Sequence, residues 1–194
     1  MKDNIQFLQA FLKNPLKVGA VAPSSPDLAW QMLDGITPDE NNVILELGVG
    51  TGAITKCIRE IVTDDDRSYL GVELDDKLVS NLRVRFPGMN IVAGCAARAT
   101  ELHRESGLGK VSYILCCLPF VTLPDEVVDG VLSEVEKFMD QGCMFRAFQY
   151  AHGYYTPSAR RLRRFMRERY GRTKRSKLVT KNLPPAYTVT WSTL

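Results

Sequence analysis

The sequence is poor in the residues that build metal centres and disulfide frameworks. Its 194 residues include only two histidines, His103 and His152, which lie far apart in the chain. The five cysteines are odd in number and none belongs to a Cys-x-x-Cys pair, so neither a zinc site nor a disulfide framework is indicated. We therefore expect no bound metal ion, and cysteines that are reduced and largely buried.

Long hydrophobic runs are also missing. No apolar stretch reaches the roughly 18 to 20 residues that a membrane-spanning helix needs, and the N-terminal residues lack the apolar core of a signal peptide. These observations predict a cytoplasmic protein. Hydrophobic residues make up 45% of the sequence, which is enough for one well-packed core, and we expect a single domain over residues 1–194.

The N-terminal residues have the pattern of an amphipathic helix. Ile5, Leu8, Phe11 and Leu12 recur at helical spacing and lysines flank them. Such a helix either packs on the domain or lies in a membrane interface. We therefore divide the chain into a helix within residues 1–17 and a core formed by residues 18–194.

Basic residues are concentrated in one segment near the C-terminus. Ser158–Lys177 holds ten Lys or Arg and one Glu, a local charge of +9 that leaves about −6 for the rest of the chain. This charge would attract an anionic membrane surface or a nucleic acid, although a solvated helix face has the same composition.

The most informative stretch is Val43–Thr55, in which an apolar run ends in three glycines, Gly48, Gly50 and Gly52. This is the pattern of a strand, a tight turn that a ligand can approach closely, and a helix start. It also fits the dinucleotide fingerprint, so the glycines alone do not select the cofactor. Glu46 favours a cation, because a carboxylate there would attract the amino acid end of S-adenosylmethionine and repel a pyrophosphate.

Strand and helix patterns alternate along the chain. Strands are predicted at 43–47, 68–72, 90–93, 110–117, 144–150, 176–181 and 187–191, with helices at 26–33, 53–62, 76–86, 98–105, 157–170 and from Pro124 onward. This alternation predicts an α/β fold with a parallel, doubly wound sheet and a crevice at the carboxyl ends of its strands. The candidate residues at those ends are Glu46–Gly52, Glu73, Cys95–Ala96, Cys117–Phe120 and Tyr150. Glu73 lies about 20 residues beyond the glycines, where such folds present a carboxylate to ribose hydroxyls.

With these residues in place, the sequence resembles the class I S-adenosylmethionine-dependent methyltransferases, and within them the bacterial phospholipid N-methyltransferases. The most specific matching segments are Phe11–Ser25, Leu45–Thr55, Leu118-Pro119 and Asn182–Ala186. The resemblance implies a Rossmann-like, mostly parallel seven-stranded sheet with an antiparallel last strand. It also implies S-adenosylmethionine as cofactor, S-adenosylhomocysteine as product, and methylation of the amine of phosphatidylethanolamine at the inner face of a membrane.

The resemblance and the positions of residues at the strand ends together predict individual site residues. Those expected at the cofactor are Pro23, Ser24, Ser25, Glu46, Gly48, Gly50, Thr51, Gly52, Glu73, Leu74, Cys95, Ala96 and Cys117. Leu118, Pro119 and Tyr150 are expected at the reacting amine, with Tyr150 accepting a proton, orienting the amine or simply belonging to the core. The expected partners are a phospholipid substrate and an anionic membrane surface, the latter bound through Met1–Lys17 and Arg160–Lys177.

Three positions depart from the family pattern. Cys95 and Ser112 replace acids, and Cys116-Cys117 replaces the Ser-Gly that precedes Leu-Pro. Because a hydrogen bond to a charged acceptor contributes roughly 1.5 to 3 kcal/mol, we expect these changes to weaken the adenine contact. Two alternatives remain: an RNA adenine N6-dimethyltransferase, which shares the glycine turn and the Leu-Pro-aromatic step, and a membrane- or RNA-associated protein that keeps the fold but has weak or lost turnover.

Overall fold

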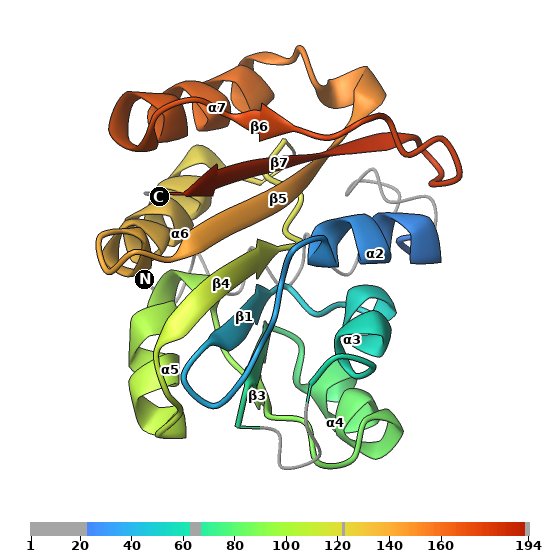
Figure 1. Ribbon diagram of the computed structural model, residues 1–194, viewed down its shortest axis with the longest axis vertical. Helices are drawn as coiled ribbons and strands as arrows, with labels where there is room; N and C mark the ends of the chain where they lie inside the picture. Colours follow the sequence, from blue (N-terminus) through green and yellow to red (C-terminus); the bar gives the residue numbers. More distant parts are fainter. Residues whose placement is uncertain (1–22, 63–66, 122, 193–194) are drawn as a thin grey trace.

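The computed structural model describes residues 23–62, 67–121 and 123–192 (Figure 1). The predicted helix within residues 1–17 and most of the Phe11–Ser25 motif lie outside this part of the chain. A seven-stranded sheet forms the centre of the molecule, with the strand order β3-β2-β1-β4-β5-β7-β6. The strands are β1 (Val43–Leu47), β2 (Tyr69–Glu73), β3 (Ile91–Ala93), β4 (Val111–Cys116), β5 (Met144–Tyr150), β6 (Lys174–Arg175) and β7 (Ala186–Ser192).

Strands β1 to β5 are parallel, and β7 is antiparallel to both β5 and β6. The order reverses between β1 and β4, which lie side by side at the centre of the sheet. In doubly wound folds this switch point is where a crevice opens beyond the carboxyl ends of the strands. The predicted mostly parallel sheet with an antiparallel last strand is confirmed.

Helices cover both faces of the sheet (Figure 1). They are α2 (Pro26–Leu33), α3 (Ala53–Ile58), α4 (Asp76–Arg85), α5 (Ala99–Ser106), α6 (Asp125–Met139) and α7 (Pro157–Tyr170), with single 3-10 turns η1 (Ala96–Arg98) and η2 (Ala151–Gly153). Helices α2, α3 and α4 bury apolar side chains in one core, and α5, α6 and α7 bury theirs in a second core on the opposite face. Within the described ranges, none of these helices combines the length and apolar character needed to cross a bilayer.

Most of the predicted elements are confirmed. The predicted segments 26–33, 43–47, 144–150 and 157–170 match the observed elements residue for residue. The predicted bounds of β2, β3 and β4 differ from the observed ones by one residue at one or both ends. The predicted helix at 53–62 ends earlier, at Ile58, and the one at 98–105 is preceded by the 3-10 turn η1.

The sixth strand was predicted wrongly, at 176–181 instead of Lys174–Arg175. The Ser176 backbone N–H donates to the Thr188 carbonyl at 3.0 Å, but the Thr188 N–H donates to Ser176 Oγ, also at 3.0 Å. Because a side-chain hydroxyl replaces the backbone carbonyl there, the regular ladder with β7 ends at Ser176.

The first described residues are held by a distant part of the chain. Ser25 caps α2 by accepting a hydrogen bond from the Leu28 N–H at 3.2 Å, and Pro26 occupies the first helical turn, as the sequence predicted. The Ser25 N–H donates to Asn182 Oδ1 at 2.8 Å, and Asn182 Nδ2 donates to the Pro184 carbonyl at 2.7 Å. The buried Asn182 therefore joins the Pro23–Ser25 loop to the Asn182–Ala186 segment.

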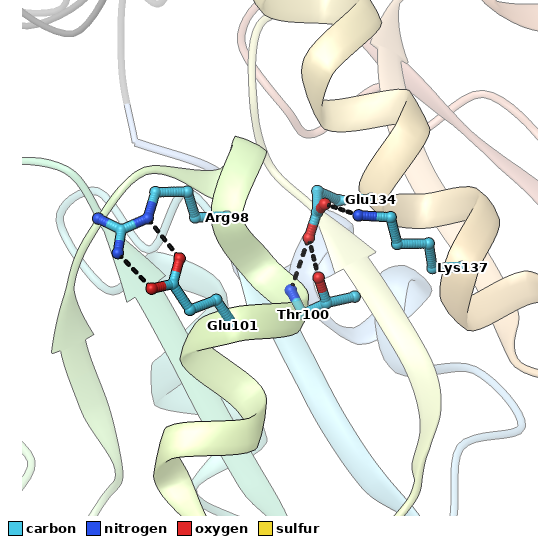
Figure 2. A network of polar contacts seen from close by, with 5 residues as sticks. All are labelled: Arg98, Thr100, Glu101, Glu134 and Lys137. Atoms are coloured by element: carbon cyan, nitrogen blue, oxygen red, sulfur yellow. Dashed lines mark hydrogen bonds and ion pairs between the residues drawn. The ribbon is translucent and has the colours of Figure 1, made fainter. Parts of the chain in front are cut away.

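A polar network joins α5 to α6 (Figure 2). The buried Glu134 of α6 accepts hydrogen bonds from the Thr100 N–H at 2.7 Å and from the Thr100 hydroxyl, and it pairs with Lys137. Burial opposes ionisation of Glu134, but the hydrogen bonds from Lys137 and Thr100 outweigh it and lower the pKa of its carboxyl group. The network fixes the start of α5, and with it the η1 turn that follows the end of β3.

Replacement of this carboxylate tests its contribution to the fold. We expect Glu134→Leu to lower the free energy of unfolding by roughly 1–3 kcal/mol at about pH 7, because the Thr100 N–H loses its partner. Since the folded-state pKa is lowered, the contribution exists above the ordinary value of 4.5 and is lost as the pH falls, so the difference should shrink in acid. Urea unfolding measures it, with Glu101→Leu, which breaks the exposed pair with Arg98, as the matched control. Equal losses in the two variants would contradict the assignment.

Candidate functional site

A pocket of about 520 Å³ opens beyond the carboxyl ends of the parallel strands. It is lined by residues at the ends of β1, β2, β3, β4 and β5 and in the loops that follow them, together with Pro23 and Ser24. The loops after β1 and β4 are joined at their base, because the Cys117 N–H donates to the Leu47 carbonyl at 2.9 Å. The pocket therefore lies at the carboxyl ends of the strands, as the sequence predicted, and at the switch point between β1 and β4.

The glycine turn forms one wall of this pocket. Gly48 has a φ of +82°, which residues with side chains rarely adopt, and a Cβ there would lie 2.6 Å from Leu118 Cδ2 and would have to displace the Leu118 side chain. Gly50 has a φ of +58°, but a Cβ there would meet nothing within 4 Å. The turn therefore packs against Leu118 on one side and leaves open space at Gly50 on the other.

The carboxylate of Glu73 holds the glycine turn in place. Its Oε2 accepts from the Gly50 N–H at 2.7 Å, and its Oε1 accepts from the N–H groups of Leu74 and Asp75 at 2.8 and 3.0 Å. A carboxylate has about four acceptor positions, so three backbone donors leave capacity for one more. Glu73 thus shapes the turn and retains an acceptor position for a ligand hydroxyl.

A second carboxylate, Glu46, is fully buried at the end of β1. Its Oε2 accepts from Thr55 Oγ1 at 2.8 Å and from the Tyr69 hydroxyl at 2.7 Å, while the Cys117 thiol lies 3.9 Å from Oε1. Burial raises the pKa of Glu46 to about 7, opposed by the hydrogen bonds from Tyr69 and Thr55. Burial and the Glu46 carboxylate in turn raise the pKa of the Cys117 thiol, so Cys117 stays protonated at neutral pH.

Aromatic and apolar side chains line the part of the pocket next to β4 and β5. Leu118, Pro119 and Phe120 follow β4, and Phe148 and Tyr150 come from β5. The Phe148 and Tyr150 rings meet edge to face with centroids 5.5 Å apart. Burial raises the pKa of Tyr150, so its phenol is protonated at neutral pH and serves as a hydrogen-bonding group.

The structure places most of the predicted site residues together. All but Ser25 and Gly52 of the predicted cofactor and amine residues line the pocket: Pro23, Ser24, Glu46, Gly48, Gly50, Thr51, Glu73, Leu74, Cys95, Ala96, Cys117, Leu118, Pro119 and Tyr150. Ser25 caps α2, and a Cβ at Gly52 would meet Phe86 and Leu82 of the apolar core rather than a ligand. The roles of these residues in catalysis and binding stay predictions.

One expectation about the departures from the family pattern is wrong. Ser112 lies at the start of β4, at the opposite end of the strand from the pocket, and its hydroxyl donates to Asn42 Oδ1 at 2.9 Å. It therefore cannot weaken an adenine contact. Cys95 does line the pocket, where it leaves the wall after β3 without a charged acceptor.

Several pocket residues were not found from the sequence. His152 stacks on Tyr150 with ring centroids 5.7 Å apart, and Gln149 also forms part of the wall. Helix α6 contributes Val127 and Val131 from one side of the helix. Their positions follow from packing, and only the i, i+4 spacing of the two valines was visible in advance. In the described part of the chain, no group of three His, Cys, Asp or Glu side chains is placed to hold a metal ion.

This arrangement fits the chemical groups of S-adenosylmethionine. Glu73 has an acceptor position for a ribose hydroxyl, and the open space at Gly50 lets a ligand approach the backbone. Glu46, with one oxygen engaged by hydroxyls, has a pKa of about 7, and a cationic end beside it would favour its ionised form. Cys95 and Ala96 offer a mostly apolar wall for a purine ring.

The titration of Glu46 makes a prediction about stability. Its pKa is 4.5 in an unfolded chain and about 7 in the fold, so its stabilising contribution is complete below pH 4.5 and is lost as the pH rises through 7. Relative to Glu46→Gln, which does not titrate, we expect the wild type to lose roughly 3 kcal/mol of unfolding free energy across this window. Urea unfolding of both proteins between about pH 4 and pH 8 measures the difference. Parallel pH profiles would refute the assignment.

No family model matches the chain. The chain is 30% identical over 142 residues to an ornithine lipid N-methyltransferase of Singulisphaera acidiphila. The matched region covers 72% of this chain and 73% of that protein. It is 42% identical over 60 residues to the ribosomal RNA small subunit methyltransferase A of Chlorobium limicola, but this covers only 31% of the chain and 20% of that protein.

Solved structures share the fold. The magnesium protoporphyrin IX methyltransferase of Synechocystis, determined with bound S-adenosylmethionine, has a TM-score of 0.58 at 14% identity and covers 96% of this chain and 83% of its own. This likeness concerns the fold alone, whereas the similarity to the Singulisphaera protein extends over most of both sequences. The chain therefore belongs to the class I S-adenosylmethionine-dependent methyltransferases, in the family that contains the ornithine lipid N-methyltransferase, with S-adenosylmethionine as its cofactor.

Proposed function

We propose that this enzyme methylates the amine of a lipid headgroup at the inner face of a membrane. The main support for the proposal is the sequence similarity to an ornithine lipid N-methyltransferase, which extends over 73% of that protein's length. The apolar and aromatic wall beside β4 and β5 supports it, because a headgroup amine has to enter a water-poor space to react. A phosphatidylethanolamine-type phospholipid is one candidate acceptor, and ornithine lipid is the other.

The residues that would hold the cofactor are those around the two carboxylates. Glu73 would bind the ribose in the open space beside Gly50, Glu46 would face the cationic end, and Cys95 and Ala96 would lie beside the adenine. When bound, S-adenosylmethionine supplies a sulfonium methyl group, which the lone pair of the amine attacks as the carbon–sulfur bond breaks and S-adenosylhomocysteine leaves. The amine releases one proton for each methyl group that it gains.

The acceptor side of the pocket has to favour a neutral amine. An ammonium with a pKa near that of lysine, ~10.4, costs roughly 4–5 kcal/mol to deprotonate at pH 7. Phe120, Phe148 and the Leu118-Pro119 step surround the amine with apolar groups, which destabilise the cation and lower this cost. Tyr150, with its protonated phenol, is suited to orient the amine and not to act as a base.

An RNA substrate is the weaker alternative. The match to the ribosomal RNA methyltransferase covers only 31% of this chain. An adenine amine is a weak nucleophile that needs a strong acceptor, and the residue available here is Cys117, whose protonated thiol is a poor acceptor. The protonated thiol at Cys117 therefore favours an aliphatic amine over adenine.

A transfer assay tests the proposed acceptor. We expect the wild type to move the methyl group of labelled S-adenosylmethionine to phosphatidylethanolamine or ornithine lipid in anionic vesicles, and not to ribosomal RNA, because the wall beside Tyr150 suits an aliphatic amine. Methylation of RNA with none on either lipid would reject the proposal. Calorimetric binding of S-adenosylmethionine without transfer to any acceptor would instead favour the alternative that has lost turnover.

The membrane surface is proposed to meet the basic face of α7. A groove beside this helix is lined by Arg160, Arg161, Arg163, Arg164, Arg167 and Arg172, with Asp125 as the acidic residue in its lining. Arg161 is neutralised by Asp125 and Asp129, with the N–O distances at 2.8 and 2.6 Å. The guanidinium groups of Arg164, Arg167 and Arg172 make no ion pair or hydrogen bond with any residue in the described ranges, so their charge is free to attract anionic headgroups.

Neutralising two of these arginines tests the surface. At about 1 kcal/mol for each cation near an anionic leaflet, the double change Arg164→Gln and Arg167→Gln should weaken binding to phosphatidylserine-containing vesicles roughly thirtyfold. The matched control is Lys56→Gln with Lys77→Gln, which removes the same charge from α3 and α4, away from α7 (Figure 1). Vesicle sedimentation at fixed ionic strength measures the affinity. Equal losses in the two double variants would reject a specific role for α7.

A further inference from the structure

Gln149 has an unusual position in the pocket wall. It lies on β5 beside Tyr150, and only 4% of its surface is exposed. Neighbouring pocket residues on its side of the sheet, such as Leu123 and Val127, are apolar. A buried amide in such surroundings needs hydrogen-bond partners for both of its ends.

The orientation of this amide is determined by Arg163. The Arg163 guanidinium donates to Gln149 Oε1 through Nη1 and to the Tyr154 carbonyl at 2.7 Å through Nη2, and it stacks 3.8 Å from the centroid of the Tyr154 ring. A guanidinium has donors only, so the atom that it contacts has to be the amide oxygen. The NH₂ group of Gln149 is therefore directed away from Arg163.

That NH₂ group lacks a partner. Gln149 Nε2 is buried and makes no hydrogen bond to any residue that the structure describes. Its two donors are also polarised, because the amide oxygen accepts a hydrogen bond from the positively charged guanidinium of Arg163. Leaving buried donors unpaired is costly, and because Gln149 belongs to the pocket wall, a small movement of its amide toward the pocket would let an acceptor atom of a ligand remove that cost.

We propose that the Gln149 amide, held by Arg163, is a substrate-binding group that donates a hydrogen bond to an acceptor oxygen of the lipid headgroup. This inference rests on the proposed function, because it takes the lipid amine to react beside Tyr150. Such lipids carry an acceptor oxygen a few bonds from the amine: a phosphate oxygen in phosphatidylethanolamine, or the carbonyl of the acyl amide in ornithine lipid. The hydrogen bond selects amines that carry this oxygen over plain alkyl amines.

Replacement by the isosteric acid is the direct test. Gln149→Glu keeps an acceptor for Arg163 and removes both donors, whereas Gln149→Met removes the donors without adding charge. We expect both variants to raise the KM for short-chain phosphatidylethanolamine, for short-chain ornithine lipid, or for both, by at least tenfold, which corresponds to about 1.4 kcal/mol. The kcat and the calorimetric Kd for S-adenosylmethionine should stay within about twofold, because the lost contact binds substrate and transition state equally.

The control and the outcomes separate this inference from the proposed function. Gln141→Glu makes the same change at an exposed glutamine, whose Nε2 donates to the Lys137 carbonyl at 2.8 Å, and should leave both constants unchanged. If KM rises for just one of the two lipids, the result supports the inference and identifies that lipid as the one whose oxygen accepts the hydrogen bond. Unchanged lipid KM values in an active variant, or a tenfold weaker Kd for S-adenosylmethionine, would overturn the Gln149 assignment alone. A wild type that methylates neither lipid would overturn the proposed function and this inference with it.

Discussion

The carboxylate of Glu73 joins two loops that the ends of parallel strands bring together. It accepts one hydrogen bond from the turn after β1, at Gly50, and two from the loop after β2, at Leu74 and Asp75. Because Glu73 is 5% exposed, these bonds form in a low-dielectric environment, where charge-assisted hydrogen bonds are strong. Glu73 thus holds the glycine turn at Gly50, while the Gly48 N–H donates to the Val72 carbonyl at 2.9 Å and fixes the part of the turn next to Leu118.

Glu46 contrasts with Glu73 although it lies on the neighbouring strand. Its partners are the hydroxyls of Thr55 and Tyr69 instead of three backbone amides, and burial raises its pKa to about 7. A cation bound beside a carboxyl group lowers the pKa of that group, because it favours the ionised form. A carboxyl group with a pKa near 7 would therefore lose its proton when the cation binds. Glu73 therefore shapes the turn, whereas Glu46 provides a carboxyl group whose ionised form a bound cation would stabilise.

The walls of the pocket come from segments far apart in the chain. Asn182 holds Ser25 across 157 residues of sequence, and Glu134 holds the start of α5, which follows the Cys95–Ala96 wall. Arg163 reaches from α7 to Gln149 on β5. Each of these contacts uses a buried or half-buried polar group whose partner lies on another element, so the pocket depends on the packing of both cores.

The sequence by itself determined the local elements and the glycine turn. The cap Ser25-Pro26, the strand at 144–150 and the helix at 157–170 follow from periodicity, capping and turn residues, which are properties of neighbouring residues. The tertiary structure alone decided that Ser176 ends β6, and that His152 and Gln149 belong to the pocket wall. These outcomes depend on which strand ends meet and on which polar groups pair across the two cores, and contacts of that kind leave no periodic signal in the chain.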